Sequence, residues 1–174
     1  MKSYAGIGSR RVPKSEYWKF AEVAEILEDL GYSLNSGGAG GSDQFFEDST
    51  TVGTIFLPWN GFNGKSISMS KGNMSYEVPE VNLDLVRQFH PAFDRLSQAA
   101  QKLMSRNSYQ VLGQGLKNPV DMVICWTPSG KDEGGTAQAC RIARSRNIPV
   151  YNLNSDKERR LLLDRLKMEE HFKE

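Results

Sequence analysis

The chain has 174 residues, of which 25% are charged, and a formal net charge of +1. This length predicts one domain, residues 1–174, with a single hydrophobic core. The balanced charge excludes an overall positive potential that would bind nucleic acid, although a local basic face is still compatible with it. No apolar run approaches the roughly 20 residues of a membrane span, and the first residues lack a secretory apolar stretch. We therefore expect a cytoplasmic protein without a membrane partner.

The few cysteines and histidines argue against a metal centre. Cys125 and Cys140 have no Cys-x-x-Cys spacing, and His90 and His171 lie far apart in the sequence. Cysteines in an apolar strand and a helix are typical of buried thiols in a reducing compartment. We expect no metal and no required cofactor.

Segments typical of strands alternate with segments typical of helices. The expected strands are 3–7, 32–35, 54–57, 122–126 and 150–153. The expected helices are 13–30, 42–49, 83–89, 96–104, 136–146 and 156–172. This alternation predicts an α/β, Rossmann-like doubly wound fold, with a mainly parallel sheet of five or more strands and helices on both faces.

Residues 59–80 show neither the apolar spacing of a helix nor the alternation of a strand, and they are rich in Gly, Ser and Asn. A loop of this length in a compact domain is either functional, such as a lid, or partly disordered. It carries Lys65 and Lys71. We expect these lysines to approach phosphates when a ligand is bound, or the loop to pack against a second subunit of a homo-oligomer.

Three glycine-rich turns follow expected strands and precede expected helices, at 6–10, 36–43 and 134–136. Glycine allows a ligand to approach the backbone closely, and a helix N-terminus offers unpaired N–H groups to an anion. Because the carboxyl ends of parallel strands share one edge of the sheet, the turns are expected to be neighbours. They predict one cleft for the phosphate and ribose of a small nucleotide.

Charged residues near these turns have specific expected roles. Arg10 and Arg11 suit phosphate contacts, with a solvated surface position as the alternative for one of the two. Arg106 also suits a phosphate contact, and a helix C-terminal cation is its alternative. Asp43 either hydrogen-bonds a ribose or caps the next helix. Glu47 lies one turn further along that helix and is the candidate catalytic acid, with a solvated position as its alternative.

Aromatic residues at the same edge are candidates for stacking on a base. Trp59, Trp126 and Tyr109 suit this role, and core filling is the alternative for the tryptophans. The full set of expected ligand-binding residues is Gly6, Ile7, Gly8, Ser9, Arg10, Ser36, Gly37, Gly38, Ala39, Gly40, Ser42, Asp43, Pro58, Trp59, Arg106, Trp126, Gly134, Gly135 and Thr136.

The first two turns together resemble the SLOG superfamily. Gly-Ile-Gly-Ser-Arg at 6–10 and Ser-Gly-Gly-Ala-x-Gly-x-Asp at 36–43 carry this similarity, which spans about residues 3–153. The superfamily includes the DNA-processing protein DprA, LOG-type phosphoribohydrolases and nucleotide sensors of bacterial immunity. Residues 106–113, followed by 121–128 and 134–138, are most similar to small DprA-like proteins of bacteriophages. The resemblance implies a Rossmann-like fold and a nucleotide-derived ligand.

One departure from the LOG pattern bears on activity. The resemblance places a catalytic glutamate where this chain has Ala139, and Lys131–Glu133 replaces a Pro-Gly-Gly step. Glu47 or Glu133 is then needed as a substitute. Three hypotheses follow. The first is a protein that binds a small nucleotide, with sequestration of an ADP-ribose-type or cyclic nucleotide immune signal as its use. The second is an N-glycosidic phosphoribohydrolase. The third is DprA-like binding of single-stranded DNA, placed last because the chain has no net basic charge.

Overall fold

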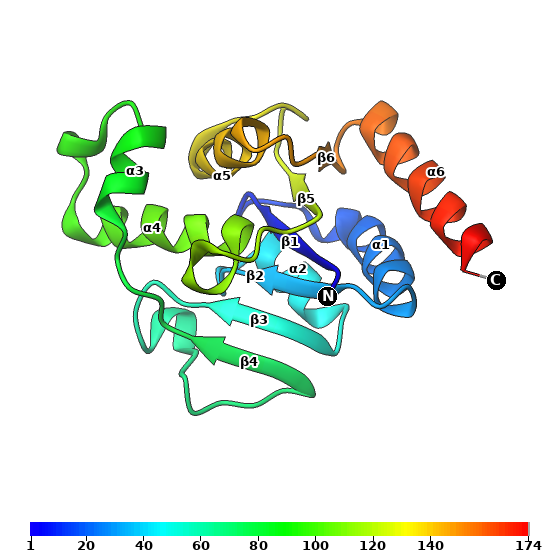
Figure 1. Ribbon diagram of the computed structural model, residues 1–174, viewed down its shortest axis with the longest axis horizontal. Helices are drawn as coiled ribbons and strands as arrows, with labels where there is room; N and C mark the ends of the chain where they lie inside the picture. Colours follow the sequence, from blue (N-terminus) through cyan, green and yellow to red (C-terminus); the bar gives the residue numbers. More distant parts are fainter. Residues whose placement is uncertain (174) are drawn as a thin grey trace.

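A six-stranded, fully parallel sheet forms the centre of the protein, for which a computed structural model describes residues 1–173 (Figure 1). The strands are β1 (Ser3–Gly8), β2 (Ser33–Ser36), β3 (Val52–Phe56), β4 (Asn73–Glu77), β5 (Met122–Trp126) and β6 (Val150–Asn152). Their order is β4-β3-β2-β1-β5-β6, so the chain first moves outward from β1 and then returns to add β5 on its other side. The topological switch point therefore lies between β1 and β5.

Helices cover both faces of this sheet. They are α1 (Tyr17–Asp29), α2 (Ser42–Asp48), α3 (Leu83–Phe89), α4 (Gln98–Leu112), α5 (Gly134–Ser145) and α6 (Asp156–Phe172). Short 3-10 turns lie at Lys14–Glu16, Phe62–Gly64, Phe93–Arg95 and Gln114–Leu116. The expected Rossmann-like α/β fold is confirmed, and α6 has the expected bounds.

Side-chain alternation along β5 shows why both faces need cover. Ile124 joins a core cluster formed with α1, α2 and α6, whereas Val123 and Cys125 join a second cluster with α4 and α5. Successive residues of a strand point to opposite faces, so an all-apolar strand buries both sides. In Figure 1, α1 and α6 lie side by side to the right of β1 and β5, and α4 and α5 lie to the left of these strands.

The sequence-based expectation of an uninterrupted loop over 59–80 needs correction. Residues Asn73–Glu77 form the edge strand β4, which pairs in parallel with β3. Met74 and Tyr76 are buried and the alternating positions Asn73 and Ser75 are exposed. Two alternating apolar residues among glycines and serines are too few to predict a strand from the sequence. Hydrogen bonding to β3 stabilises this segment as a strand instead.

Helix α4 is longer than the expected 96–104. The Ser97 side chain accepts a hydrogen bond from the Ala100 amide at its start, and the helix continues to Leu112. All residues from Ser105 to Leu112 are buried, so this half of the helix has no solvent-exposed face. A helix buried all round lacks the amphipathic period by which helices are recognised.

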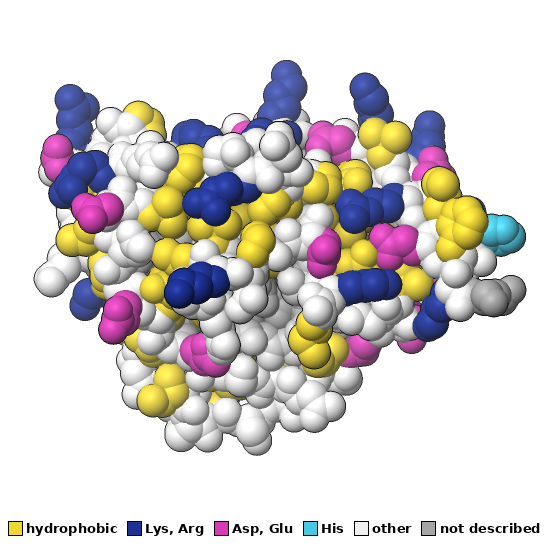
Figure 2. Space-filling model, viewed as in Figure 1, with side chains coloured by type: hydrophobic (Ala, Val, Ile, Leu, Met, Phe, Trp, Pro, Cys, Tyr) yellow, Lys and Arg dark blue, Asp and Glu magenta, His cyan; other side chains and the backbone are white. Residues whose placement is uncertain are grey.

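The surface carries no single charged field on the face shown in Figure 2. Lysine and arginine side chains are interspersed there with acidic and hydrophobic ones. None of the helices within residues 1–173 combines the length and the apolar character needed to cross a membrane.

Candidate functional site

A cavity of about 470 Å³, the main cavity, opens at the carboxyl edge of the sheet beside the switch point between β1 and β5. Ten of the expected ligand-binding residues line it. They are Ile7, Gly8, Ser9, Arg10, Ala39, Asp43, Arg106, Gly134, Gly135 and Thr136. The three glycine turns, far apart in the sequence, thus contribute to one cavity.

The first turn is held tightly against β5 and α2. A Cβ on Gly8 would lie 2.5 Å from the Trp126 carbonyl oxygen and 2.6 Å from Ser42 Oγ, so only glycine fits. The Ser9 amide donates to the Trp126 carbonyl at 2.9 Å, and Ser42 Oγ donates to the Ser9 carbonyl at 2.8 Å. These contacts fix the backbone immediately before Arg10, whose side chain lines the main cavity.

The second turn packs against a buried arginine from α4. A Cβ on Gly37 would lie 2.7 Å from Arg106 Nη1 and 2.8 Å from Asp43 Oδ2. Arg106 Nη1 donates to the Gly37 carbonyl, and its Nε donates to Asn107 Oδ1 at 2.9 Å. Asp43 Oδ2 accepts from the Ala39 amide at 3.2 Å instead of capping α2. The bare turn therefore brings a guanidinium and a carboxyl group together at the wall of the cavity.

Burial dominates the electrostatics of this pair. It raises the pKa of Asp43 to about 7, and Glu47 adds to the rise while the Arg106 cation opposes it. Burial likewise lowers the pKa of Arg106, and Asp43 opposes that shift. A carboxyl group with a pKa near neutrality can change the charge of the cavity around physiological pH.

Residues 59–65, here called the strap, cross over the second turn. The Phe62 ring lies 5.8 Å from the Arg10 guanidinium carbon and 5.6 Å from that of Arg106. Asn63 Nδ2 donates to the Gly38 carbonyl at 3.1 Å. Two arginines of the cavity thus share one aromatic ring, which restricts both of them.

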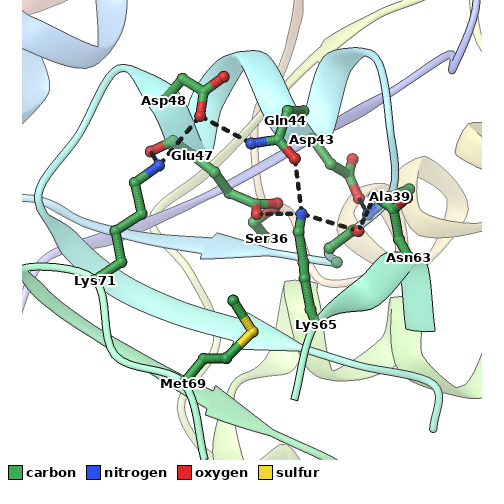
Figure 3. Close-up of polar contacts among 12 residues, drawn as sticks. Ser36, Ala39, Asp43, Gln44, Glu47, Asp48, Asn63, Lys65, Met69 and Lys71 are labelled. Carbon is green, nitrogen blue, oxygen red and sulfur yellow. Dashed lines mark hydrogen bonds and ion pairs between the residues drawn. The ribbon is translucent and has the colours of Figure 1, made fainter. Parts of the chain in front are cut away.

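A buried ion pair fastens the strap to α2 (Figure 3). Lys65 Nζ lies 2.8 Å from Glu47 Oε1 and also donates to the Gly38 carbonyl at 3.0 Å and to Gln44 Oε1 at 2.9 Å. Ser36 Oγ donates to the other Glu47 oxygen. Glu47 is 1% exposed and Lys65 is 8% exposed. The pair is therefore satisfied inside the protein, away from the main cavity.

This geometry changes two expectations. Glu47, the candidate catalyst, does not line the main cavity, and its carboxylate is occupied by Lys65 and Ser36. Lys65 is no mobile contact for phosphate but a buried anchor, because a buried charge needs a partner. Lys71 instead forms an exposed ion pair with Asp48 at 3.1 Å. Of the acidic residues, Asp43 and Glu133 line the cavity.

Both candidate stacking tryptophans lie outside the main cavity. Trp126 is buried in the core, where Nε1 donates to Glu16 Oε1 at 3.4 Å. Trp59 packs edge-on against Phe62, with ring centroids 5.2 Å apart. The expected binding residues that do not line the cavity are Gly6, Ser36, Gly37, Gly38, Gly40, Ser42, Pro58, Trp59 and Trp126.

The third turn places the N-terminus of α5 at the cavity. Gly134, Gly135 and Thr136 line it, and the first backbone bond of the helix runs from the Ala137 amide to the Glu133 carbonyl. The amides of residues 134–136 precede that bond and have no backbone partner in the described chain. Unpaired N–H groups and the positive end of a 12-residue helix favour an anion.

Sequence reasoning missed several residues that line the cavity. They are Leu103, Met104, Asn107, Gln110, Thr127, Pro128 and Ala139. Arg11 and Glu133, which the sequence reasoning considered for a phosphate contact and as a substitute acid, also line the cavity. Gln110 is the most informative, since it is 1% exposed and its Nε2 has no hydrogen-bond partner within residues 1–173. The sequence signal that could have identified these residues is the run of polar residues in the second half of α4, because buried polar groups need hydrogen-bond partners.

Comparison with known proteins supports the fold. No family model and no curated protein matches the chain. Among solved structures, DNA processing protein A from Helicobacter pylori superimposes with a TM-score of 0.60 at 18% identity, covering 94% of this chain and 72% of that one. That structure is described for its single-stranded DNA binding mode. The chain therefore has a DprA-like, Rossmann-like fold.

Proposed function

We propose that this protein binds single-stranded DNA and that one nucleotide of the strand enters the main cavity. The observation that carries the proposal is that several phosphate-binding groups come together in one cavity. Arg10, Arg11 and Arg106 line the same cavity as the N-terminal amides of α5. Arginine forks and helix N-terminal amides are the groups that bind phosphate oxygens best. The likeness to a DNA-binding protein of the same fold supports this assignment.

The interior of the cavity suits a polar ligand of nucleotide size. Its volume of about 470 Å³ lies within the range of sites for small molecules. Gln110 presents a buried amide that lacks a partner in residues 1–173. An unsatisfied buried polar group is costly, and a hydrogen bond to a base edge would remove that cost.

The charge distribution limits how the strand is held. Because the net charge is only +1 and charges of both signs are interspersed on the face in Figure 2, we expect the arginines of the main cavity to make most of the phosphate contacts. For about three neutralised phosphates, log K is expected to fall with log salt at a slope of roughly −2, since single strands release about 0.7 counterion per contact.

A free nucleotide is the second candidate. It is favoured by a cavity that holds about one nucleotide and by the low net charge of +1. In that case the protein sequesters a small nucleotide signal, of ADP-ribose or cyclic type, and a phage origin with an anti-defence role fits this use. Assembly into a homo-oligomer is a further prediction of this hypothesis.

Fluorescence anisotropy with a labelled thymidine single strand tests the first candidate. We expect salt-dependent binding that weakens at least about tenfold in Arg10→Ala/Arg11→Ala, because two charge-assisted phosphate contacts are lost. Arg160→Ala, an exposed arginine on α6, is the matched control and should bind like the parent. Competition with a mononucleotide, ADP-ribose and a cyclic dinucleotide separates the candidates. Displacement at equal or lower concentration than the unlabelled strand favours the free nucleotide, and failure to bind DNA at low salt contradicts the first proposal.

A further inference from the structure

A second cavity of about 310 Å³ lies on the other side of α4 from the main cavity. It is lined by Phe56, Glu77, Pro79, Glu80, Tyr109, Gln114 and Gly115. Phe56 and Glu77 are the last residues of β3 and β4, so the two cavities share the carboxyl edge of the sheet. They have no lining residue in common, since Tyr109 faces one and its neighbour Gln110 faces the other.

The walls of the second cavity are aromatic and apolar. The rings of Phe56 and Tyr109 are tilted by 44° with centroids 6.1 Å apart, and Pro79 completes the apolar lining. Aromatic faces carry negative electrostatic potential, which attracts cations and repels anions.

The acidic residues of this cavity lack cationic partners. Within residues 1–173 neither Glu77 nor Glu80 forms an ion pair, and the Glu77 carboxylate receives a hydrogen bond only from the Gln114 amide. Two carboxylates around a concave apolar surface give a negative potential that no ion pair within residues 1–173 neutralises.

Tyr109 adds a polar group to the lining of this cavity. The residue is 9% exposed, and its hydroxyl group is not one of the buried polar atoms that lack a partner within residues 1–173. Burial raises the pKa of Tyr109, and the nearby Glu80 charge adds to the rise. The phenol is therefore a neutral hydrogen-bonding group beside a carboxylate.

We propose that the second cavity binds an organic cation, namely an ammonium or guanidinium group on a short apolar stem. The carboxylates of Glu77 and Glu80 accept charge-assisted hydrogen bonds from the cationic head, and the rings of Phe56 and Tyr109 cover the stem. The volume accommodates about ten water-sized groups, which matches an arginine or lysine side chain or a small free amine.

Amide chemical shifts of ¹⁵N-labelled protein test this proposal, with butylguanidinium and butylammonium as probes and butyramide as the neutral control. We expect saturable shifts at Gly115 and Glu80 with both cations, and no shifts there with butyramide. Gly134 and Gly135 at the main cavity should not respond. Equal shifts at Gly115 with the neutral probe, or no shifts with either cation, would overturn the proposal.

Charge-neutral variants identify the groups responsible. In Glu77→Gln/Glu80→Gln the cation affinity should fall about tenfold, because both charge-assisted contacts are lost. The matched control Glu25→Gln/Glu170→Gln changes two exposed glutamates on α1 and α6 and should bind like the parent. Unchanged affinity in the first variant would contradict the assignment. An acetylated and amidated Gly-Arg-Gly peptide then separates the sources, since tighter binding than butylguanidinium indicates a protein side chain and equal binding indicates a free amine.

Discussion

Replacing Lys65 with methionine removes the cation of the buried ion pair while keeping the length of the side chain. It leaves the Glu47 carboxylate, whose side chain is 2% exposed, without its partner at 2.8 Å. It also leaves the Gly38 carbonyl and Gln44 Oε1 without the Lys65 donor. Removing one partner of a buried pair costs about 3–5 kcal/mol of stability, which is a large fraction of the roughly 5–15 kcal/mol that holds a domain folded.

Urea denaturation followed by circular dichroism measures this loss. We expect Lys65→Met to lower the free energy of unfolding by about 3–5 kcal/mol, equivalent to a Tm lower by roughly 10 °C for a chain of this length. Lys65→Met/Glu47→Gln should lose less, because a neutral amide accepts the Ser36 hydrogen bond without leaving a buried charge.

Lys71→Met is the control, since its ion pair with Asp48 is exposed at side-chain values of 47% and 45%. It should cost at most about 1 kcal/mol. If Lys65→Met costs no more than Lys71→Met, or if the double variant loses as much as the single one, the reasoning about the buried pair is refuted.

Three further outcomes concern the main cavity. Gly37→Ala places a methyl group 2.7 Å from Arg106 Nη1 and 2.8 Å from Asp43 Oδ2. We therefore expect the free energy of unfolding in urea to fall by about 1–3 kcal/mol and DNA binding to weaken. If both values are unchanged, the turn accommodates the methyl group and the steric argument is wrong. DNA affinity in anisotropy should fall as pH rises through about 7, because the pKa of Asp43 is raised and the group is neutral below and anionic above that pH. Asp43→Asn should abolish this pH dependence, and its persistence in the variant would assign it to another group. Phe62→Leu removes the aromatic ring that Arg10 and Arg106 share, so DNA affinity should fall roughly fivefold. Phe62→Tyr keeps the ring and should retain the parent affinity. An equal loss of affinity in both variants would rule out an aromatic role.

Much of the fold follows from local patterns in the sequence. The apolar run Met122–Trp126 and the amphipathic α6 have the expected bounds, because their periods match a buried strand and a surface helix. Two elements escape this reasoning for opposite reasons. Strand β4 has too few apolar residues to be predicted from the sequence, and it forms by hydrogen bonding to β3. The second half of α4 is buried on all sides and has no period.

The sequence predicts those features of the site that follow from the topology of the parallel sheet. Strand ends in a parallel sheet share an edge, and this alone brings Gly8, Ala39 and Gly135 to one cavity. Side-chain pairings across the fold are not readable in this way. Nothing in the spacing of Glu47 and Lys65, 18 positions apart, indicates that the lysine crosses the second turn to neutralise the glutamate.

Chemical-shift mapping with a four-nucleotide thymidine single strand tests most directly whether the main cavity is the DNA site. The proposal predicts saturable shifts of the amides of Ser9, Arg10, Gly134, Gly135 and Thr136, with no change at Gly115 in the second cavity. Shifts confined to residues away from the main cavity, or no shifts at low salt, would contradict it.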